Sequence, residues 1–439
     1  MIKDIIRNFV IWILTQESRL VLYKFKPKIV CITGNAGKTG TKDAVAAILK
    51  SDFSVWENEK SYNSDIGIPL TILHCKNAWS NLFLWFKNIL QGLVLLLLPQ
   101  SYPKWLVLEV GADKPGDISK FTKWLHPDIV IVTRIGETPV HIENFASRDD
   151  LIKEKSELVK ALKHGGLLML NSDDPDVLAM KSLALGAKVI TFGFSPNSNI
   201  RASNYKVTCA EVDHVSMPDG IAFKVDYLGN SIPVRIKGII GLNNVYSLLP
   251  AFAVGSFLGV NFLSMLQSAR EYERPLGRLK IIEGINDSII LDDTYNSSPA
   301  AVLLAFESVK DIIVPGKKIA VIGDMLELGS LTVPAHIDIG REAVTYFDLL
   351  ITVGQRAENI AKGALLAGID PKKIITFLNS VDAGDYLAKH IKKNDLVFLK
   401  GSQGIRLERA IIKILMHPED RERLLARQEK EWLGKPATA

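Results

Sequence analysis

The chain contains 439 residues, of which 47% are apolar and 23% are charged, and its formal net charge at pH 7 is +5. This length and composition predict a globular protein of two or three domains and exclude a disordered chain. The small excess of basic residues is spread along the chain, so nucleic acid is not an expected partner. Cys31, Cys75 and Cys209 lie far apart without a C-x-x-C pair, which argues against disulfides or structural zinc and favours a cytoplasmic location.

Residues 1–24 form the first predicted element, an amphipathic helix that ends before Pro27. Its apolar members include Phe9, Trp12 and Leu20. No small-residue cleavage site follows, so a secretory signal peptide is not expected. We assign residues 1–27 to this N-terminal helix, residues 28–274 to a central domain and residues 275–439 to a C-terminal domain.

A glycine-rich loop lies between a β-branched strand at 29–32 and a helix that begins at Lys38. Gly34 and Gly37 tolerate backbone angles that a Cβ would forbid, and the surrounding N–H groups form a concave site for polyphosphate. Lys38 would reach the terminal phosphates and the Thr39 hydroxyl would bind Mg²⁺. The spacing is tighter than in the common G-x-x-x-x-G-K-[ST] loop, and the alternative is a glycine-rich turn with an incidental lysine. We expect nucleotide phosphates to be bound by Gly34, Asn35, Ala36, Gly37, Lys38 and Thr39.

Leu82–Leu98 is an apolar run close to the length that spans a bilayer. Lys87, Asn88 and Gln91 interrupt it at helical spacing and form a narrow polar stripe, and a charge near the middle of a span is costly. We therefore expect first a buried or partner-facing helix, second an interfacial helix that touches a membrane, and last a true span.

Glu109 lies near the C-terminal end of one predicted buried strand of the central domain, and His141 follows another. Ligands of open α/β sheets bind outside such strand ends. The Glu109 carboxylate, at the end of the strand predicted at 105–110, can bind Mg²⁺ directly or through water. The alternative is a cap for the next segment. His141 follows the strand predicted at 129–133 in a loop rich in Gly and Pro, although a single His is more often structural than a ligand.

The order of the elements predicts an α/β fold with two sheets. Strands alternate with helices in the central domain and predict a doubly wound, mostly parallel sheet. Short alternating runs at 200–237, with Gly229-Asn230 as a hairpin turn, predict an antiparallel extension of that domain. A charged turn at Arg274-Pro275 marks the predicted domain boundary. The C-terminal domain is predicted to be a second, Rossmann-like α/β unit with strands at 289–291, 319–322, 349–353, 374–377 and 396–400.

Ten short motifs between residue 29 and about residue 408 resemble, in the same order, those of the Mur ligase family of ATP-dependent, amide-bond-forming enzymes of peptidoglycan synthesis. One such match is a weak signal, whereas ten in order are a strong one. The motifs are Thr33-Gly-Asn-Ala-Gly-Lys-Thr39, Asn63…Ile66-Gly-Ile-Pro69, Glu109-Val-Gly-Ala112, His141-Ile-Glu143, Asn171-Ser-Asp-Asp-Pro175, Gly241-Leu-Asn-Asn-Val-Tyr246, Gly277-Arg278, Asp292-Asp-Thr-Tyr-Asn296, Gly323-Asp-Met-Leu-Glu-Leu-Gly329 and Lys400-Gly-Ser402.

The resemblance implies that ATP converts a substrate carboxylate into an acyl phosphate, which the amine of an incoming peptide then attacks. Such a reaction depends on positioning and on neutralising charge. By this resemblance Lys38 is a catalytic residue at the phosphates, Thr39 and Glu109 hold one Mg²⁺, and His141 is the ligand of a second.

The resemblance assigns further roles outside the loop. Arg278 corresponds to the catalytic arginine at the γ-phosphate, Asp293 to an acid that contacts the nucleotide, and Asn244 to a residue near the adenine. Lys155 stands where many members carry a catalytic, carbamylated lysine near the metal. Since Arg278 and Asp293 lie in a different domain from the phosphate loop, the reaction is expected to require domain closure.

Within the family, the motifs point to addition of D-alanyl-D-alanine to a muramoyl-tripeptide precursor, so these two peptide substrates are the expected partners. The loop 323–329 and His336 are expected to line the site of the incoming dipeptide. Two alternatives are a ligase of the same fold with another acceptor, as in folylpolyglutamate synthases or on another cell-wall precursor, and a nucleotide-binding interaction protein without catalysis.

By comparison with the family pattern, we expect the chain to lack the N-terminal domain that grips the UDP end of the substrate. Residues 1–24 and the apolar run at 82–98 are its distinctive features instead. We hypothesise that these segments pack together, contact a membrane peripherally or a protein partner, and hold the sugar end of the substrate.

Overall fold

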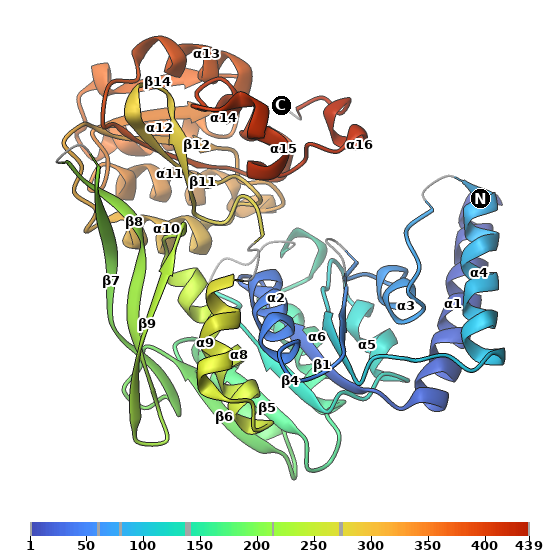
Figure 1. Ribbon diagram of the computed structural model, residues 1–439. Coiled ribbons are helices and arrows are strands. Elements are labelled where there is room, and N and C mark those ends of the chain that lie inside the picture. The colour runs from blue at the N-terminus through green and yellow to red at the C-terminus, as the bar shows by residue number, and fades with distance from the viewer. Residues whose placement is uncertain are drawn as a thin grey trace.

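A computed structural model of the protein shows two α/β lobes, coloured blue to yellow and yellow to red in Figure 1. The predicted α/β fold class, with a large, mostly parallel sheet and a second sheet, is confirmed. The structure describes residues 2–58, 62–78, 81–136, 142–212, 215–271 and 275–437.

The sheet of the central lobe is parallel from β2 to β7 and antiparallel from β7 to β9. The antiparallel part is the predicted extension, and its second turn lies at Leu228-Gly229, one residue before the expected pair. The short edge strand β2 was not predicted. In sheet order the strands are β2 (Val55–Glu57), β3 (Trp105–Glu109), β1 (Lys28–Thr33), β4 (Ile129–Val132), β5 (Leu167–Asn171), β6 (Lys188–Gly193), β7 (Ile200–Val212), β8 (Val215–Tyr227) and β9 (Asn230–Lys237).

Both faces of this sheet are covered, which explains why its central strands are apolar throughout. Val30 and Ile32 of β1 pack in one buried cluster, whereas Ile29 and Cys31 pack in the other. The first cluster includes α2 (Lys38–Leu49), α8 (Leu242–Phe257) and α9 (Phe262–Glu271). The second includes α3 (Gly67–Ile72), α5 (Asp117–Thr122), α6 (Arg148–Lys160) and α7 (Pro175–Ala179).

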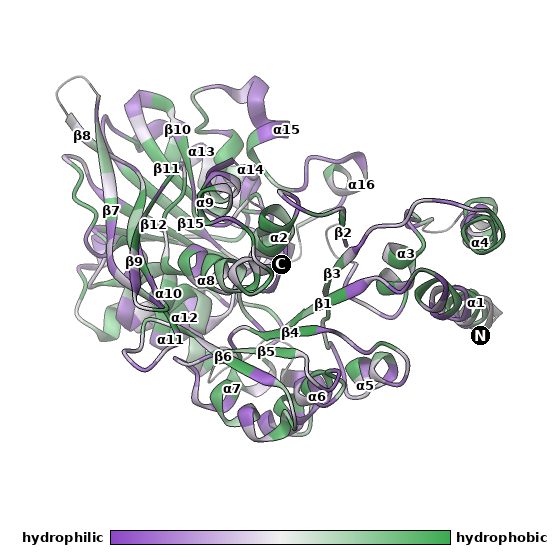
Figure 2. Ribbon diagram, turned by 60° about the horizontal axis from the view of Figure 1, so that its bottom comes forward, coloured by the Kyte–Doolittle hydropathy of each residue, from purple (hydrophilic) through white to green (hydrophobic). Residues whose placement is uncertain are grey.

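Two further helices, α1 (Ile2–Phe25) and α4 (Leu82–Leu97), lie side by side at the rim of the central lobe, next to α3 (Figures 1 and 2). Leu14 and Val21 of α1 and Leu95 of α4 enter the same buried cluster. The two segments thus pack together, as hypothesised. Among the described residues, none of the helices combines the length and the hydropathy needed to cross a bilayer.

The C-terminal lobe contains the five predicted strands and an additional one, β10, which pairs antiparallel with β11. In sheet order the strands are β10 (Lys280–Gly284), β11 (Ser288–Asp293), β15 (Leu396–Lys400), β12 (Lys318–Gly323), β13 (Leu349–Val353) and β14 (Ile374–Phe377). The helices are α10 (Pro299–Val309), α11 (Thr332–Ala343), α12 (Glu358–Leu366), α13 (Ser380–His390), α14 (Glu408–Ile412), α15 (Arg421–Leu424) and α16 (Lys430–Leu433). Arg274, at the predicted boundary, is outside the described residues, so the domain limits stay a prediction.

The extension formed by β7 to β9 connects the two lobes. Met217 of β8 and Ile240 after β9 are buried in the core of the C-terminal lobe, together with Leu279. At the start of α8, the N–H of Leu242 donates to Ser308 Oγ of α10 at 3.0 Å. These contacts hold the ends of β1 and β3 opposite the ends of β11 and β15.

Candidate functional site

The phosphate loop joins β1 to α2, and its conformation requires a glycine at position 34. Gly34 has a φ of 137°, and a Cβ there would lie 2.1 Å from Thr133 Oγ1 at the end of β4. The N–H groups of Asn35 and Ala36 donate to the Arg134 carbonyl at 2.6 and 3.1 Å. These two amides therefore hold the loop against β4, and N–H contacts to phosphate are left to the residues that open α2.

Thr39 and Glu109 form the expected pair of oxygen ligands. Because β3 lies beside β1, with Glu109 level with Ile32, the carboxylate is next to the first turn of α2. Thr39 Oγ1 donates to Glu109 Oε2 at 2.8 Å, and Asn63 Nδ2 donates to Glu109 Oε1 at 3.2 Å. A hydroxyl and a carboxylate in contact supply the hard oxygen donors that Mg²⁺ prefers, so this pair fits the ion.

Lys38 and Lys155 both contact backbone carbonyls of the phosphate loop, and Lys38 Nζ donates to the Asn35 carbonyl at 3.4 Å. Lys155 extends from α6, is buried, and donates to the Gly34 carbonyl at 3.0 Å. Burial lowers the pKa of Lys155 well below its usual value, and the positive charge of Lys38 lowers it further. Burial also lowers the pKa of Lys38, while the Glu109 carboxylate opposes that shift. The pocket thus favours a neutral amine on Lys155.

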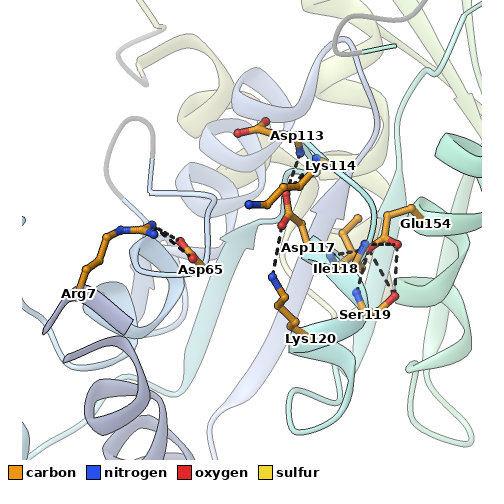
Figure 3. Close-up of polar contacts among 10 residues, drawn as sticks. Arg7, Asp65, Asp113, Lys114, Asp117, Ile118, Ser119, Lys120 and Glu154 are labelled. Atoms are coloured by element: carbon orange, nitrogen blue, oxygen red, sulfur yellow. Dashed lines mark hydrogen bonds and ion pairs between the residues drawn. The ribbon is translucent and has the colours of Figure 1, made fainter. Parts of the chain in front are cut away.

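Two carboxylates, Glu154 of α6 and Asp117 of α5, fix the segment after Glu109 where α5 begins (Figure 3). Glu154 of α6 accepts hydrogen bonds from the N–H groups of Gly116, Ile118 and Ser119 at 2.9, 2.6 and 3.0 Å. Asp117 accepts two more from the preceding turn. Asp113 in that turn opposes the lowering of the pKa values of Lys38 and Lys155 by burial. Its carboxylate therefore adds negative charge beside the two lysines.

The C-terminal lobe contributes a second charged cluster. Asp293, at the end of β11, is buried and accepts a hydrogen bond from Lys400 Nζ at 2.6 Å. The Arg278 guanidinium lies 4.6 Å from the centre of the Tyr295 ring, and Arg427 lies 5.1 Å from it. Cation–π contact with Tyr295 thus orients Arg278.

The phosphate loop, Glu109 and the Asp293–Lys400 pair with Arg278 and Tyr295 line one cavity of about 470 Å³ between the lobes. Arg278 and Lys38 are close enough for the charge of Arg278 to lower the pKa of Lys38. The cavity brings together predicted residues from both lobes: Asn35, Ala36, Gly37, Lys38, Thr39, Glu109, Asn244, Arg278 and Asp293.

Two of the expected residues lie outside the cavity wall. Gly34 and Lys155 contact each other behind the loop rather than in the cavity wall. His141 is outside the described residues, so its role as a ligand stays a prediction.

His336 does not line the cavity, and that expectation is wrong. Its side chain is buried, where Nε2 accepts a hydrogen bond from the Met325 N–H at 3.0 Å. Nδ1 lies 2.6 Å from the Thr332 carbonyl. His336 therefore holds the loop 323–329 in place, and Leu326 and Glu327 of that loop reach the cavity.

Sequence reasoning gave no site role to Lys400, Tyr295 or Arg427. Lys400 meets Asp293 because β11 and β15 are neighbours with these two residues in register. In the sequence, the only sign of a role for Lys400 is its position at the end of a predicted strand. The order of the strands in the sheet is needed to show that Asp293 is its partner. Arg427 reaches Tyr295 from the segment between α15 and α16, which carried no motif.

Comparisons with known proteins agree with this architecture. The family model described as "Mur ligase middle domain" matches residues 88–255, and "Mur ligase, glutamate ligase domain" matches residues 277–403. The UDP-N-acetylmuramoyl-tripeptide--D-alanyl-D-alanine ligase of Bacillus subtilis is 25% identical over 406 residues, covering 92% of this chain and 79% of that protein.

Solved structures give the same result. MurF ligase from Thermotoga maritima in complex with ADP superposes with a TM-score of 0.74 at 25% identity, over 94% of this chain and 84% of that one. MurF from Acinetobacter baumannii gives a TM-score of 0.73 at 22% identity, over 90% and 78% of the two chains, and supports the fold. The two family models together match more than half of the residues, in the order in which the lobes occur. The chain belongs to the Mur ligase family.

Proposed function

We propose that this Mur ligase uses ATP to join D-alanyl-D-alanine to the tripeptide of a UDP-N-acetylmuramoyl-tripeptide. The observation that carries the proposal is the cavity between the lobes, which combines Lys38, Thr39 and Glu109 with Arg278. The relatives whose names describe this reaction match nearly the whole chain. A binding protein without catalysis has no need of a lysine from one lobe and an arginine from the other at one phosphate site.

The triphosphate of ATP is proposed to bind between the phosphate loop and Arg278. Lys38 and Arg278 would neutralise the charge that develops on the γ-phosphate. Thr39 and Glu109 would hold Mg²⁺, which shields phosphate charge when it is bound. Asn244, beside the loop, is proposed to lie near the adenine, and Asp293 would contact the nucleotide from the second lobe.

The reaction proceeds in two steps. A carboxylate oxygen of the tripeptide attacks the γ-phosphorus, the bond to the β-phosphate oxygen breaks, and ADP leaves. The amine of D-alanyl-D-alanine then attacks the acyl carbon and loses a proton, and inorganic phosphate departs as the amide forms. The loop 323–329, held by His336, is proposed to border the dipeptide site through Leu326 and Glu327.

Lys155 is proposed to act as its carbamate. A neutral amine is the form that reacts with CO₂, and burial beside Lys38 favours that form. The product would carry a negative charge beside Lys38 and the Mg²⁺ pair, where the unmodified ammonium would repel the ion. His141 stays the predicted ligand of a second Mg²⁺.

We further place the reaction in the cytoplasm, where ATP is available. Cys31 and Cys75 are buried free thiols, and Cys209 is an exposed free thiol, as a reducing compartment permits. Contact of residues 1–24 and 82–98 with a membrane or a protein is not part of the proposed chemistry.

The test is phosphate release from ATP and Mg²⁺ with the muramoyl-tripeptide nucleotide and D-alanyl-D-alanine, with each component omitted in turn. Release should require all components, and mass spectrometry should find the pentapeptide product. Release with glutamate and a folate in place of the cell-wall substrates would support the folylpolyglutamate-synthase-like alternative instead. Nucleotide binding without release under any condition would support the non-catalytic alternative.

A further inference from the structure

The outward sides of α1 and α4 form one exposed apolar surface. On α4, the exposed side chains recur at helical spacing along the whole helix, and Phe83 and Leu97 are 75% and 78% exposed. On α1, Tyr23 is 78% exposed. The surface, called the α1–α4 face below, consists of Phe9, Trp12, Leu20, Tyr23, Phe83, Phe86, Leu90, Leu93, Val94 and Leu97.

The α1–α4 face belongs to a firmly attached pair of helices. Lys24 Nζ donates to the carbonyls of Leu95, Leu96 and Leu98 at 2.9 to 3.0 Å, which caps the end of α4. Gln91 Nε2 donates to the His74 carbonyl at 2.7 Å.

Two further contacts attach the pair to the central lobe. Arg7 pairs with Asp65 before α3 at 3.2 Å (Figure 3). Aromatic rings stack from α1 to β2 in the order Phe25, Tyr102, His74 and Trp56. With its inner side fixed, the pair presents its apolar outer side permanently.

The charges around the α1–α4 face identify the occupant. Within residues 7–28 and 81–104 the one carboxylate is Glu17, which is buried. The basic residues of these segments are Arg19, Lys24, Lys26, Lys87 and Lys104, together with Arg7 and Lys28, which pair with Asp65 and Asp128. Two copies of the chain meeting through this face would bring like charges together, which opposes self-association. Aromatic and aliphatic side chains with a basic margin match the surface of an anionic bilayer.

We propose that the α1–α4 face docks the enzyme on the surface of a bilayer that contains anionic lipids. The 16 residues of α4 measure about 24 Å, less than the thickness of a hydrocarbon core. Helix α1 is longer, at 24 residues, but it contains Arg7, Glu17 and Arg19, whose charges oppose a span. In this proposal both helices therefore lie along the interface. Neither helix lines the cavity between the lobes, so the inference goes beyond the proposed reaction.

The experiment is flotation of the full-length protein with vesicles of phosphatidylcholine alone or with 30 mol% phosphatidylglycerol. The wild-type protein should float with the anionic vesicles, and 0.5 M salt should weaken binding. The double variant Leu90→Glu/Leu93→Glu should bind about ten-fold more weakly or worse, because charges replace two exposed leucines that would be buried in the bilayer. Leu366→Glu, at an exposed leucine of α12, is the matched control and should bind like the wild type.

A second measurement is independent of these variants. Tryptophan emission should shift to shorter wavelength when anionic vesicles are added, and Trp12→Phe should reduce that shift. Wild-type protein that does not float with anionic vesicles, or a double variant that floats equally well, would overturn the proposal. So would a wild-type dimer that the double variant converts to a monomer by light scattering, since the face would then bind a second copy.

Discussion

The cavity between the lobes and the α1–α4 face differ in how they treat polar and apolar groups. In the cavity, the charged residues Glu109, Asp293 and Lys400 are buried, and each has a polar partner: Lys400 pairs with Asp293, and Glu109 accepts a hydrogen bond from Thr39. On the α1–α4 face, apolar side chains are exposed and charges lie at the margin. Burying charges is costly and exposing large apolar patches is unusual, so each arrangement indicates a ligand: a triphosphate in the first case and a bilayer in the second.

The two surfaces should be separable by mutation. Lys38→Met should lower phosphate release about a thousand-fold, because it removes a preorganised charge at the γ-phosphate. Vesicle flotation should be unchanged. The measurement is initial-rate phosphate release at saturating substrates, with Lys120→Met, at an exposed lysine of α5, as the control. Activity within a few-fold of wild type would contradict the assigned role.

Arg278→Ala should lower kcat about a hundred-fold and change the KM for ATP much less, because its charge is expected to matter most in the transition state. Steady-state kinetics with ATP as the varied substrate separates the two constants. Arg341→Ala, at an exposed arginine of α11, is the control. A large rise in KM with unchanged kcat would mean that Arg278 serves ground-state binding alone.

Lys400→Met should destabilise the C-terminal lobe by about 3 kcal/mol, since it leaves the buried Asp293 carboxylate without its cation. The double variant Lys400→Met/Asp293→Leu should recover much of that loss, because no unpaired charge remains. Urea denaturation followed by circular dichroism measures both. A single variant as stable as wild type would show that solvent reaches Asp293.

The smallest predicted effect is a change in thermal stability when Glu17 is replaced. The Glu17 side chain is buried against Gly92 between α1 and α4. Burial raises the pKa of this carboxyl from 4.5 to about 7. The stability that comes from its neutral form is complete below pH 4.5 and is lost as the pH rises through 7. Glu17→Gln should therefore raise Tm by about 2 °C at pH 8 and leave it unchanged at pH 4.5. An equal shift at both pH values would contradict this assignment.

Much of the fold followed from the sequence because the relevant signals are local. The β-branched runs of β1 and β4, the alternation in β7 to β9 and the turn after β8 each specify their own structure. The short strands β2 and β10 gave no such signal. Their pairing depends on neighbours distant in the chain.

The site was partly predictable for the same reason. Lys38 and Thr39 follow from the order of strand, loop and helix. The ion pair of Asp293 with Lys400 depends on strand order, which periodicity does not reveal. His336 was misassigned because a motif gives a residue's position in the chain but not the direction of its side chain. Similarly, the apolar pattern of 82–98 predicted a helix but left open which side is buried.

The most direct measurement is a crystal structure with Mg²⁺ and a non-hydrolysable ATP analogue. The γ-phosphate should lie within hydrogen-bond distance of both Lys38 Nζ and the Arg278 guanidinium, with the ion on Thr39 and Glu109. An analogue held by the central lobe alone, with no contact to Arg278, would contradict the conclusion that two lobes share one triphosphate.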